Sequence, residues 1–206
     1  MTDAAERLQL LDWKRQLSEL YGKIRTANDP SAAWTAWRTT RDTLFLNHPQ
    51  SPLPAGDRGL PRRPSYYPYD SDARALADIV GVDEMPYEIV ANDGTTSRFT
   101  HFAAARFTLF GQSCELGLFW LEGYGGGLFL PFRDGTSGAE TYGGGRYLLD
   151  TVKGADLGID GGRLVLDFNF AYNPSCAYDP RWTCPLAPPG NRLPMALRAG
   201  ERTAPA

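Results

Sequence analysis

The feature that most constrains the fold is the spacing of the apolar segments from residue 65 onward. Stretches rich in Val, Phe, Tyr and Thr alternate with Gly and Asn turns, and the gaps are too short for the helical crossovers that parallel strands need. Two hairpins are expected, turning at Asp93-Gly94 and at Gly111-Gln112. Further strands are expected in "GLFLPF", "GRYLLD", "RLVLDFNF" and "RLPMALRAG". The pattern predicts an antiparallel meander that closes into a barrel or a sandwich.

The N-terminal part has a helical pattern. Apolar residues recur at steps of three and four from Asp3 to about Ala27, and Asp3 and Glu6 have the spacing of a capping box. The residues that share this face are Leu10, Trp13, Leu17, Leu20, Tyr21 and Ile24. This spacing predicts one amphipathic helix.

A second helix is expected to begin at "NDPSAAW". Asp29 can cap it, Pro30 suits its first position, and Pro49 sets its end. Trp34 and Trp37 fall on one face, where burial in a core is the ordinary use of an aromatic stripe.

These patterns divide the chain into four segments of an α+β protein. We expect a helical segment over 1–48, a Pro-rich connection over 49–64, an antiparallel β core over 65–200 and a tail over 201–206.

Charge and composition argue against several classes of partner. The net charge is −3, so the clustered Lys and Arg of a nucleic-acid surface are missing. The one basic cluster, "DRGLPRRP" with Arg58, Arg62 and Arg63, is interpreted as a solvated linker, with an anionic partner as the alternative. No apolar run approaches the roughly 18 residues of a membrane helix, and we expect no membrane partner.

The first residues differ from a signal peptide. Asp3 and Glu6 stand where a signal peptide is basic, and charges interrupt the region that should be apolar. We therefore expect a cytoplasmic protein.

Polar residues gather near the end of the chain. If "RLVLDFNFAYNP" is a strand, Asp167, Asn169 and Asn173 share one face, and Arg146 of a neighbouring strand could pair with Asp167 or Asn169. Glu140 and Tyr142 could add a carboxylate and a phenol. This cluster is either a ligand pocket or a buried structural network.

The cysteines allow three interpretations. Seven residues separate Cys176 from Cys184, unlike common zinc knuckles, and no His lies nearby, so no metal site is expected. In a reducing compartment the two are expected to be buried thiols that anchor an irregular Pro-rich loop, with a disulfide or a metal site as the alternatives. Cys114, within an expected strand, is predicted to lie in the core.

A family resemblance follows from longer motifs. "LFLPFRDGTSGAETYGGGRYLLD" and "LVLDFNFAYNPSCAYDPRWTCPLAPPGNRLPMALRAGE" resemble the bacterial family catalogued as domain of unknown function 1684, over residues 128–201. "SYYPYD" is similar to an earlier landmark of that family, and residues 1–48 match its N-terminal segment only loosely. The residues that match the signature are Asp134, Thr136, Gly138, Thr141, Tyr142, Gly145, Arg146, Asp167, Asn169, Ala171, Tyr172, Asn173, Pro174, Cys176, Cys184, Pro185, Asn191, Ala199, Gly200 and Glu201. The resemblance implies membership and no activity.

Three hypotheses of function result. The first is a β-barrel-like domain that binds a small molecule, with Arg146 holding an acidic group of the ligand. Its binding residues would be Glu140, Tyr142, Arg146, Asp167, Asn169 and Asn173.

The second hypothesis is an acid-base hydrolase or isomerase in the same pocket, with Asp167 or Glu140 as base and Tyr142 as donor. The third is an interaction module whose Trp-bearing helices are the contact surface, with a homo-oligomer as one form of the association. No motif indicates a cofactor, so none is expected.

Overall fold

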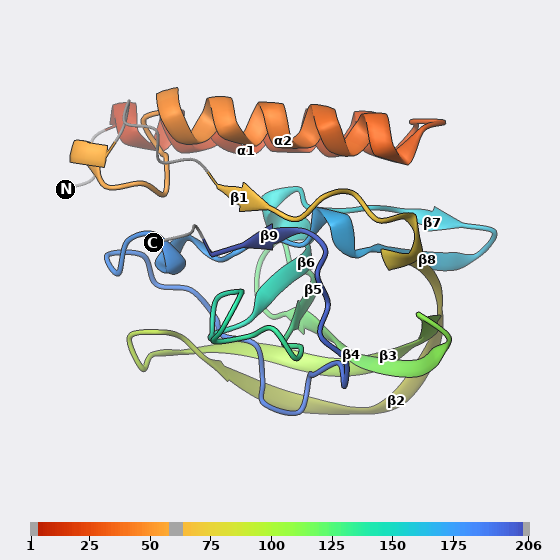
Figure 1. The fold of residues 1–206 in the computed structure, drawn as a ribbon. Helices are drawn as coiled ribbons and strands as arrows, with labels where there is room; N and C mark the ends of the chain where they lie inside the picture. Colours follow the sequence, from red (N-terminus) through yellow and green to blue (C-terminus); the bar gives the residue numbers. More distant parts are fainter. Residues whose placement is uncertain (1–3, 58–63, 204–206) are drawn as a thin grey trace.

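The computed structural model describes residues 4–57 and 64–203, and it shows a helix pair above a curved antiparallel sheet (Figure 1). The helices are α1 (Ala4–Arg25) and α2 (Pro30–Asn47). The strands are β1 (Ser65–Tyr66), β2 (Arg74–Val90), β3 (Thr96–Leu109), β4 (Gln112–Leu121), β5 (Gly127–Phe132), β6 (Arg146–Asp150), β7 (Ile159–Asp160), β8 (Arg163–Asp167) and β9 (Glu201–Arg202). Short 3₁₀ helices include η3 (Thr151–Lys153), η4 (Phe168–Phe170) and η5 (Ser175–Ala177). The predicted α+β class is confirmed.

Both helices form where the apolar periodicity predicts them. The carboxylate of Asp29 accepts hydrogen bonds from the backbone N–H groups of Ser31 and Ala32, at 2.9 and 3.1 Å, so it caps α2 as expected. The helix stops two residues before Pro49. The capping role expected of Asp3 falls outside the described residues, as does the basic cluster at 58–63.

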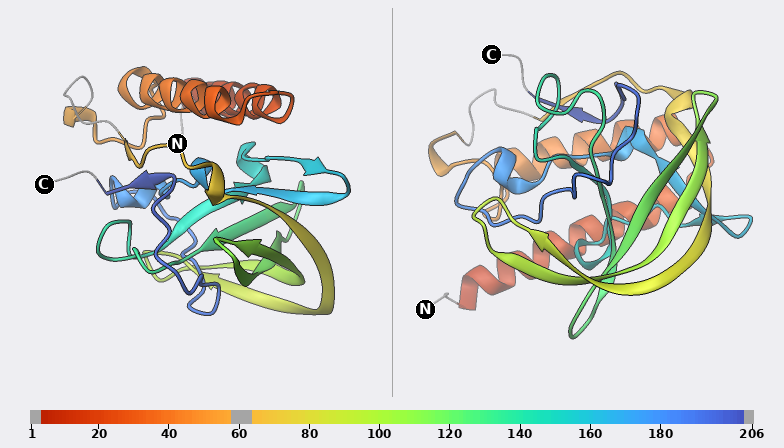
Figure 2. Two further views of the ribbon diagram at one scale, coloured as in Figure 1. Left: turned by 45° about the vertical axis from the view of Figure 1, so that its right-hand side comes forward. Right: turned by 90° about the horizontal axis from the view of Figure 1, so that it is seen from below.

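The large sheet has the strand order β6-β5-β4-β3-β2-β8-β7, and every pairing in it is antiparallel. It curves strongly along the long strand β2, which pairs with β8 at its start and with β3 over most of its length (Figure 2). The sandwich-like meander is confirmed, but the barrel is not: the sheet stays open between β6 and β7. Beyond Asp167 the chain enters η4, and an isolated backbone bridge, Tyr147–Tyr172, joins the segment after η4 to β6 in place of a strand pairing.

The two hairpins are confirmed, one of them with a shifted turn. Gly94 has φ of 85° in the turn between β2 and β3. Between β3 and β4 the turn lies at Phe110-Gly111, one residue earlier than predicted, and both residues have positive φ (48° and 73°). A two-residue turn of this kind needs positive φ at both positions, and Phe is rarely found there.

Of the two strands predicted near the C-terminus, one is shorter than predicted and the other does not form. The expected strand "RLVLDFNF" ends at Asp167, because its carboxylate accepts from the N–H of Asn169 and starts η4. The expected strand "RLPMALRAG" does not form, since side chains occupy its backbone groups: the N–H of Leu197 donates to Asp134. The last strand, β9, instead begins at Glu201. The sequence pattern assigns this residue to the tail, but its side chain is fully buried.

The helices and the sheet share one hydrophobic core. Trp37 is fully buried and stacks edge-on against Phe170 at 5.5 Å, and the indole N–H of Trp34 donates to the carbonyl of Asn169 at 3.0 Å. Both tryptophans are thus core residues, as predicted. Among the described residues, no helix is long and apolar enough to cross a membrane.

Candidate functional site

The signature residues centre on Arg146, which is completely buried. Its guanidinium donates to the carboxylate of Asp134 at 2.9 Å and to the carbonyl oxygens of Leu197, Ala199 and Glu201. The predicted pairing of Arg146 with Asp167 or Asn169 is wrong, because β6 pairs with β5 and not with β8. Arg146 therefore fastens the C-terminal segment to the edge of the sheet.

Asp134 is the buried counter-ion of this clamp. One of its oxygens accepts from the N–H and the hydroxyl of Thr136, both at 2.6 Å, and from the N–H of Leu197 at 3.2 Å. Its second oxygen pairs with Arg146. Burial lowers the pKa of Arg146, and the Asp134 charge opposes that effect. The protein's own groups thus occupy both terminal nitrogens of the guanidinium predicted to hold a ligand, and its buried Nε has no hydrogen-bond partner among the described residues.

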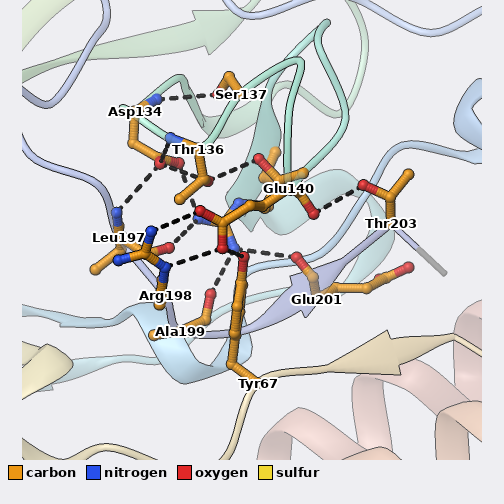
Figure 3. Close-up of polar contacts among 12 residues, drawn as sticks. Tyr67, Asp134, Thr136, Ser137, Glu140, Leu197, Arg198, Ala199, Glu201 and Thr203 are labelled. Atoms are coloured by element: carbon orange, nitrogen blue, oxygen red, sulfur yellow. Dashed lines mark hydrogen bonds and ion pairs between the residues drawn. The ribbon is translucent and has the colours of Figure 1, made fainter. Parts of the chain in front are cut away.

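Glu140 lies at the exposed side of the same network (Figure 3). Its carboxylate accepts two hydrogen bonds from Arg198, at 2.9 and 2.7 Å, and one from the hydroxyl of Tyr67 at 3.0 Å. Hydrogen bonds from Arg198 and Tyr67 lower the pKa of Glu140. A carboxylate held in this way is a weak base, which argues against the catalytic role considered for it.

Asn173 belongs to a second buried network, around Glu201. The N–H and the side-chain amide of Asn173 donate to the Glu201 carboxylate at 3.1 and 3.2 Å. Arg41 of α2 pairs with the same carboxylate at 2.8 Å, and both side chains are buried. Burial raises the pKa of Glu201, and the Arg41 charge opposes this shift. This network ties helix α2 to β9.

Asp167 differs from the other signature carboxylates, because it lines a cavity. Its Oδ1 accepts from the backbone N–H of Asn169 at 3.1 Å and from the amide of the same residue at 2.8 Å. Asn169 also bonds both backbone groups of Asp70, which fixes its orientation. Burial raises the pKa of Asp167 to about 6, against smaller opposing effects from Asn169 and Arg74.

The cavity measures about 300 Å³, and residues around the α1–α2 loop and from the hairpin of β7 and β8 line it. Arg25 and Arg74 both line the cavity. Arg74 stands opposite Asp167 in the β2–β8 pairing, so the two side chains share a face. Its contact with Asp160 is long, at 3.9 Å, and leaves the guanidinium one-third exposed.

The structure therefore does not gather the six predicted binding residues into one pocket. Asp167 and Asn169 lie together, Arg146 and Asn173 both contact Glu201, and Tyr142 contacts Cys176 at 3.6 Å. Sequence reasoning missed Arg25 and Arg74 as cations of the cavity. The register of β2 against β8 could have indicated Arg74, but local patterns do not reveal a pairing between segments so far apart in the chain.

The three cysteines are free and buried, and Cys114 faces the core as predicted. Within residues 4–57 and 64–203, no three His, Cys, Asp or Glu side chains are grouped as a metal site would need.

Fold and site together define a class: an α+β protein in which two helices cover an open antiparallel sheet and buried ion pairs fasten the C-terminal segment. The chain belongs to the family described as "protein of unknown function (DUF1684)", whose profile matches residues 62–202.

A solved relative supports this assignment. The solution NMR structure of an uncharacterised protein of Haloarcula marismortui is 38% identical, covers 84% of this chain and 93% of its own, and superposes with a TM-score of 0.60. No curated protein matches the chain.

Proposed function

We propose that the protein binds a small carboxylate-bearing molecule in the cavity beside Asp167. The observation that carries the proposal is the grouping of a buried carboxyl group, with a pKa raised to about 6, and the guanidinium of Arg74 along one cavity of about 300 Å³. This volume lies at the lower end of the range for small-molecule sites.

The charges around the cavity favour a ligand with an acidic group and a neighbouring hydroxyl or amine. Arg74 can bind a carboxylate with two parallel hydrogen bonds, and its present ion pair is long. Arg25 is more firmly engaged, because it donates to the carbonyl of Asp156 at 3.0 Å. Asp167 can donate to a ligand oxygen when protonated, or accept from an amine when ionised. Hydroxy acids and amino acids fit this pattern.

The first experiment compares native and denaturing mass spectra of freshly purified protein. A reproducible extra mass that Arg74→Ala loses supports the proposal and names the chemical class of the ligand. If no mass is retained, two-dimensional NMR titration with a panel of small hydroxy and amino acids tests weaker binding.

The matched control is Arg15→Ala, which removes the same charge from an exposed position on α1. Shift changes at the cavity that saturate in the wild type and in Arg15→Ala, but not in Arg74→Ala, support the site. The proposal fails if no acid of the panel perturbs the cavity, or if Arg74→Ala binds like the wild type.

A second candidate function is acid-base catalysis at the same cavity. It is favoured by Asp167, whose pKa of about 6 suits a group that exchanges protons near neutral pH. Of the three catalytic residues considered from the sequence, only Asp167 lines this cavity; Glu140 and Tyr142 do not. Turnover of a bound acid that Asp167→Asn abolishes, while binding survives, would establish this function.

Association through the helices remains a third proposal, in a changed form. Trp34 and Trp37 are buried against this chain's own core, so they are not a free contact surface. Leu8 and Leu11 of α1 are exposed, at 65% and 51%. Sedimentation of the wild type and of a Leu8→Gln, Leu11→Gln variant tests whether they join two copies. The cytoplasmic location and bacterial origin also remain predictions.

A further inference from the structure

The loop from Cys176 to Cys184 holds two thiols against each other. The backbone N–H of Cys176, in η5, donates to the sulfur of Cys184 at 3.4 Å. Because the N–Cα bond is about 1.5 Å long, the Cys184 sulfur lies within about 5 Å of the Cys176 Cα. The hydroxyl of Tyr142 lies 3.6 Å from the sulfur of Cys176.

These contacts make the two sulfurs chemically unequal. Hydrogen bonds from the Cys176 thiol and N–H lower the pKa of Cys184 to about 6, with the positive charge of Lys153 adding to the effect and burial opposing it. The hydrogen bond to Cys184 and burial raise the pKa of Cys176. Tyr142, Tyr147 and Lys153 face the pair, and Lys153 also pairs with Asp150 at 3.2 Å. These shifts favour the thiolate at Cys184 and the protonated thiol at Cys176.

We propose that Cys184 and Cys176 form a dithiol site that reduces hydrogen peroxide and closes into a disulfide. The Cys184 thiolate attacks one peroxide oxygen, so a S–O bond forms, the O–O bond breaks, and the hydroxide that leaves takes a proton from solvent to become water. The Cys176 sulfur then attacks the Cys184 sulfenic acid; the S–S bond forms, and the S–O oxygen leaves as water with the Cys176 proton. Two thiols are oxidised and one peroxide becomes two waters.

Burial selects the oxidant. Cys176 and Cys184 are only 9% and 3% exposed, so a bulky disulfide cannot align with either sulfur, whereas hydrogen peroxide is close to water in size. The site is separate from the Asp167 cavity, since neither cysteine lines it. The reaction therefore needs no ligand in that cavity.

Closing the disulfide would act on a loop that holds another part of the chain. Within this loop, Arg181 donates a hydrogen bond to the carbonyl oxygen of Ser51 at 3.3 Å. The indole N–H of Trp182 donates to the carbonyl oxygen of Pro52 at 3.2 Å. Oxidation is thus expected to change the amide environment of residues 51–53, which follow helix α2.

The test treats reduced, full-length protein with hydrogen peroxide near pH 7 and counts thiols after denaturation. We expect three thiols to become one, the mass to fall by about 2 Da as two hydrogens are lost, and a Cys176–Cys184 peptide to appear after digestion. Cys176→Ser should hold a sulfenic acid on Cys184 that dimedone traps. Cys184→Ser should keep its thiols over the same time.

The matched control is Cys114→Ser, because Cys114 is buried and its burial raises its pKa. This variant should form the same disulfide at the wild-type rate. If a serine variant fails to fold, the peptide map of the oxidised wild type still shows whether the Cys176–Cys184 disulfide forms. Three thiols remaining after treatment, a disulfide between two chains, or first oxidation at Cys114 would overturn the proposal.

Discussion

At the scale of single residues, many polar side chains of the signature are buried and form hydrogen bonds within the protein. Arg146 and Asp134 are both completely buried, and the three carbonyl oxygens around the guanidinium come from residues 197–201. Such a pair is strongly coupled, because removing one partner leaves an unpaired charge away from water. The signature is therefore explained first by what holds the C-terminal segment in place.

This view predicts a large effect for Arg146→Ala. The substitution leaves Asp134 and three carbonyl oxygens without their donor, and the free energy of unfolding should fall by about 3 to 5 kcal/mol. Arg198→Ala removes an arginine whose side chain is 63% exposed, and it should change stability by less than about 1 kcal/mol. Urea unfolding of both variants measures the contrast. Equal losses would show that the buried clamp is not structural.

A second residue-scale prediction concerns pH. Folding raises the pKa of Asp167 from an ordinary value near 3.8 to about 6, because burial disfavours its charged form. In this window the folded protein keeps a proton that the unfolded chain releases, so the free energy of unfolding falls as pH rises. The fall should reach about 3 kcal/mol by pH 7.

Asp167→Asn isolates that effect. The amide oxygen can still accept the hydrogen bonds of Asn169, but the side chain no longer titrates. Relative to the wild type, the variant should gain stability between pH 4 and pH 7, as followed by urea unfolding at several pH values. A difference that does not change with pH would contradict the shifted pKa.

At the scale of elements, one glycine decides how the last strand packs. Gly200, next to β9, has φ of 75°, and a Cβ there would lie 2.6 Å from the carbonyl oxygen of Ala171 and 2.7 Å from that of Phe168. Gly94, in the β2–β3 turn, has φ of 85° and nothing within 4 Å of the same position. The two glycines share a positive φ and differ in packing.

Substitution by alanine at each position separates these causes. Gly94→Ala should lose about 1 to 2 kcal/mol, from strain at positive φ alone. Gly200→Ala should lose a further 1 to 3 kcal/mol, because rigid backbone atoms must move. Thermal unfolding of the two variants measures the difference. Similar melting temperatures would mean that the backbone around Gly200 can shift to accept a Cβ at little cost in free energy.

Elements that depend on local pattern were predictable from the sequence, and elements that depend on distant partners were not. Both helices and both hairpins follow from periodicity, from Asp29 as a cap and from glycine turns. The end of β8 was missed because Asp167 bonds its own backbone two residues on, which competes with a strand. The alternation of polar residues therefore stopped where the 3₁₀ helix began, and the predicted common face did not form.

At the scale of the whole molecule, the pairing of β2 with β8 places the candidate site. It sets Arg74 opposite Asp167, while the last residue of α1 adds Arg25 to the same cavity. These three residues come from separate parts of the chain, and no spacing in the sequence relates them. Asp167 was predictable as a functional candidate from its polar surroundings, but its partners needed the topology.

The helices also have a role that their position in the sequence does not indicate. The family profile begins at residue 62, yet Trp34 and Trp37 lie in the common core and Arg41 neutralises the buried Glu201. A fragment of residues 49–206 would expose that core and leave a buried carboxylate without its cation. We expect it to lose fixed tertiary structure, because both changes are costly.

Near-ultraviolet circular dichroism and the dispersion of amide NMR signals test the fragment against the full chain. The control is the Leu8→Gln, Leu11→Gln variant, which keeps the helices and alters only exposed positions of α1, so it should fold like the wild type. A fragment with a native-like spectrum would mean that the β core is stable alone and that residues 1–48 are a separate segment, as the sequence pattern predicts. Loss of structure in the fragment alone would instead make the helix pair part of the cooperative unit, because the ion pair between Arg41 and Glu201 and the aromatic contact between Trp37 and Phe170 both cross that boundary.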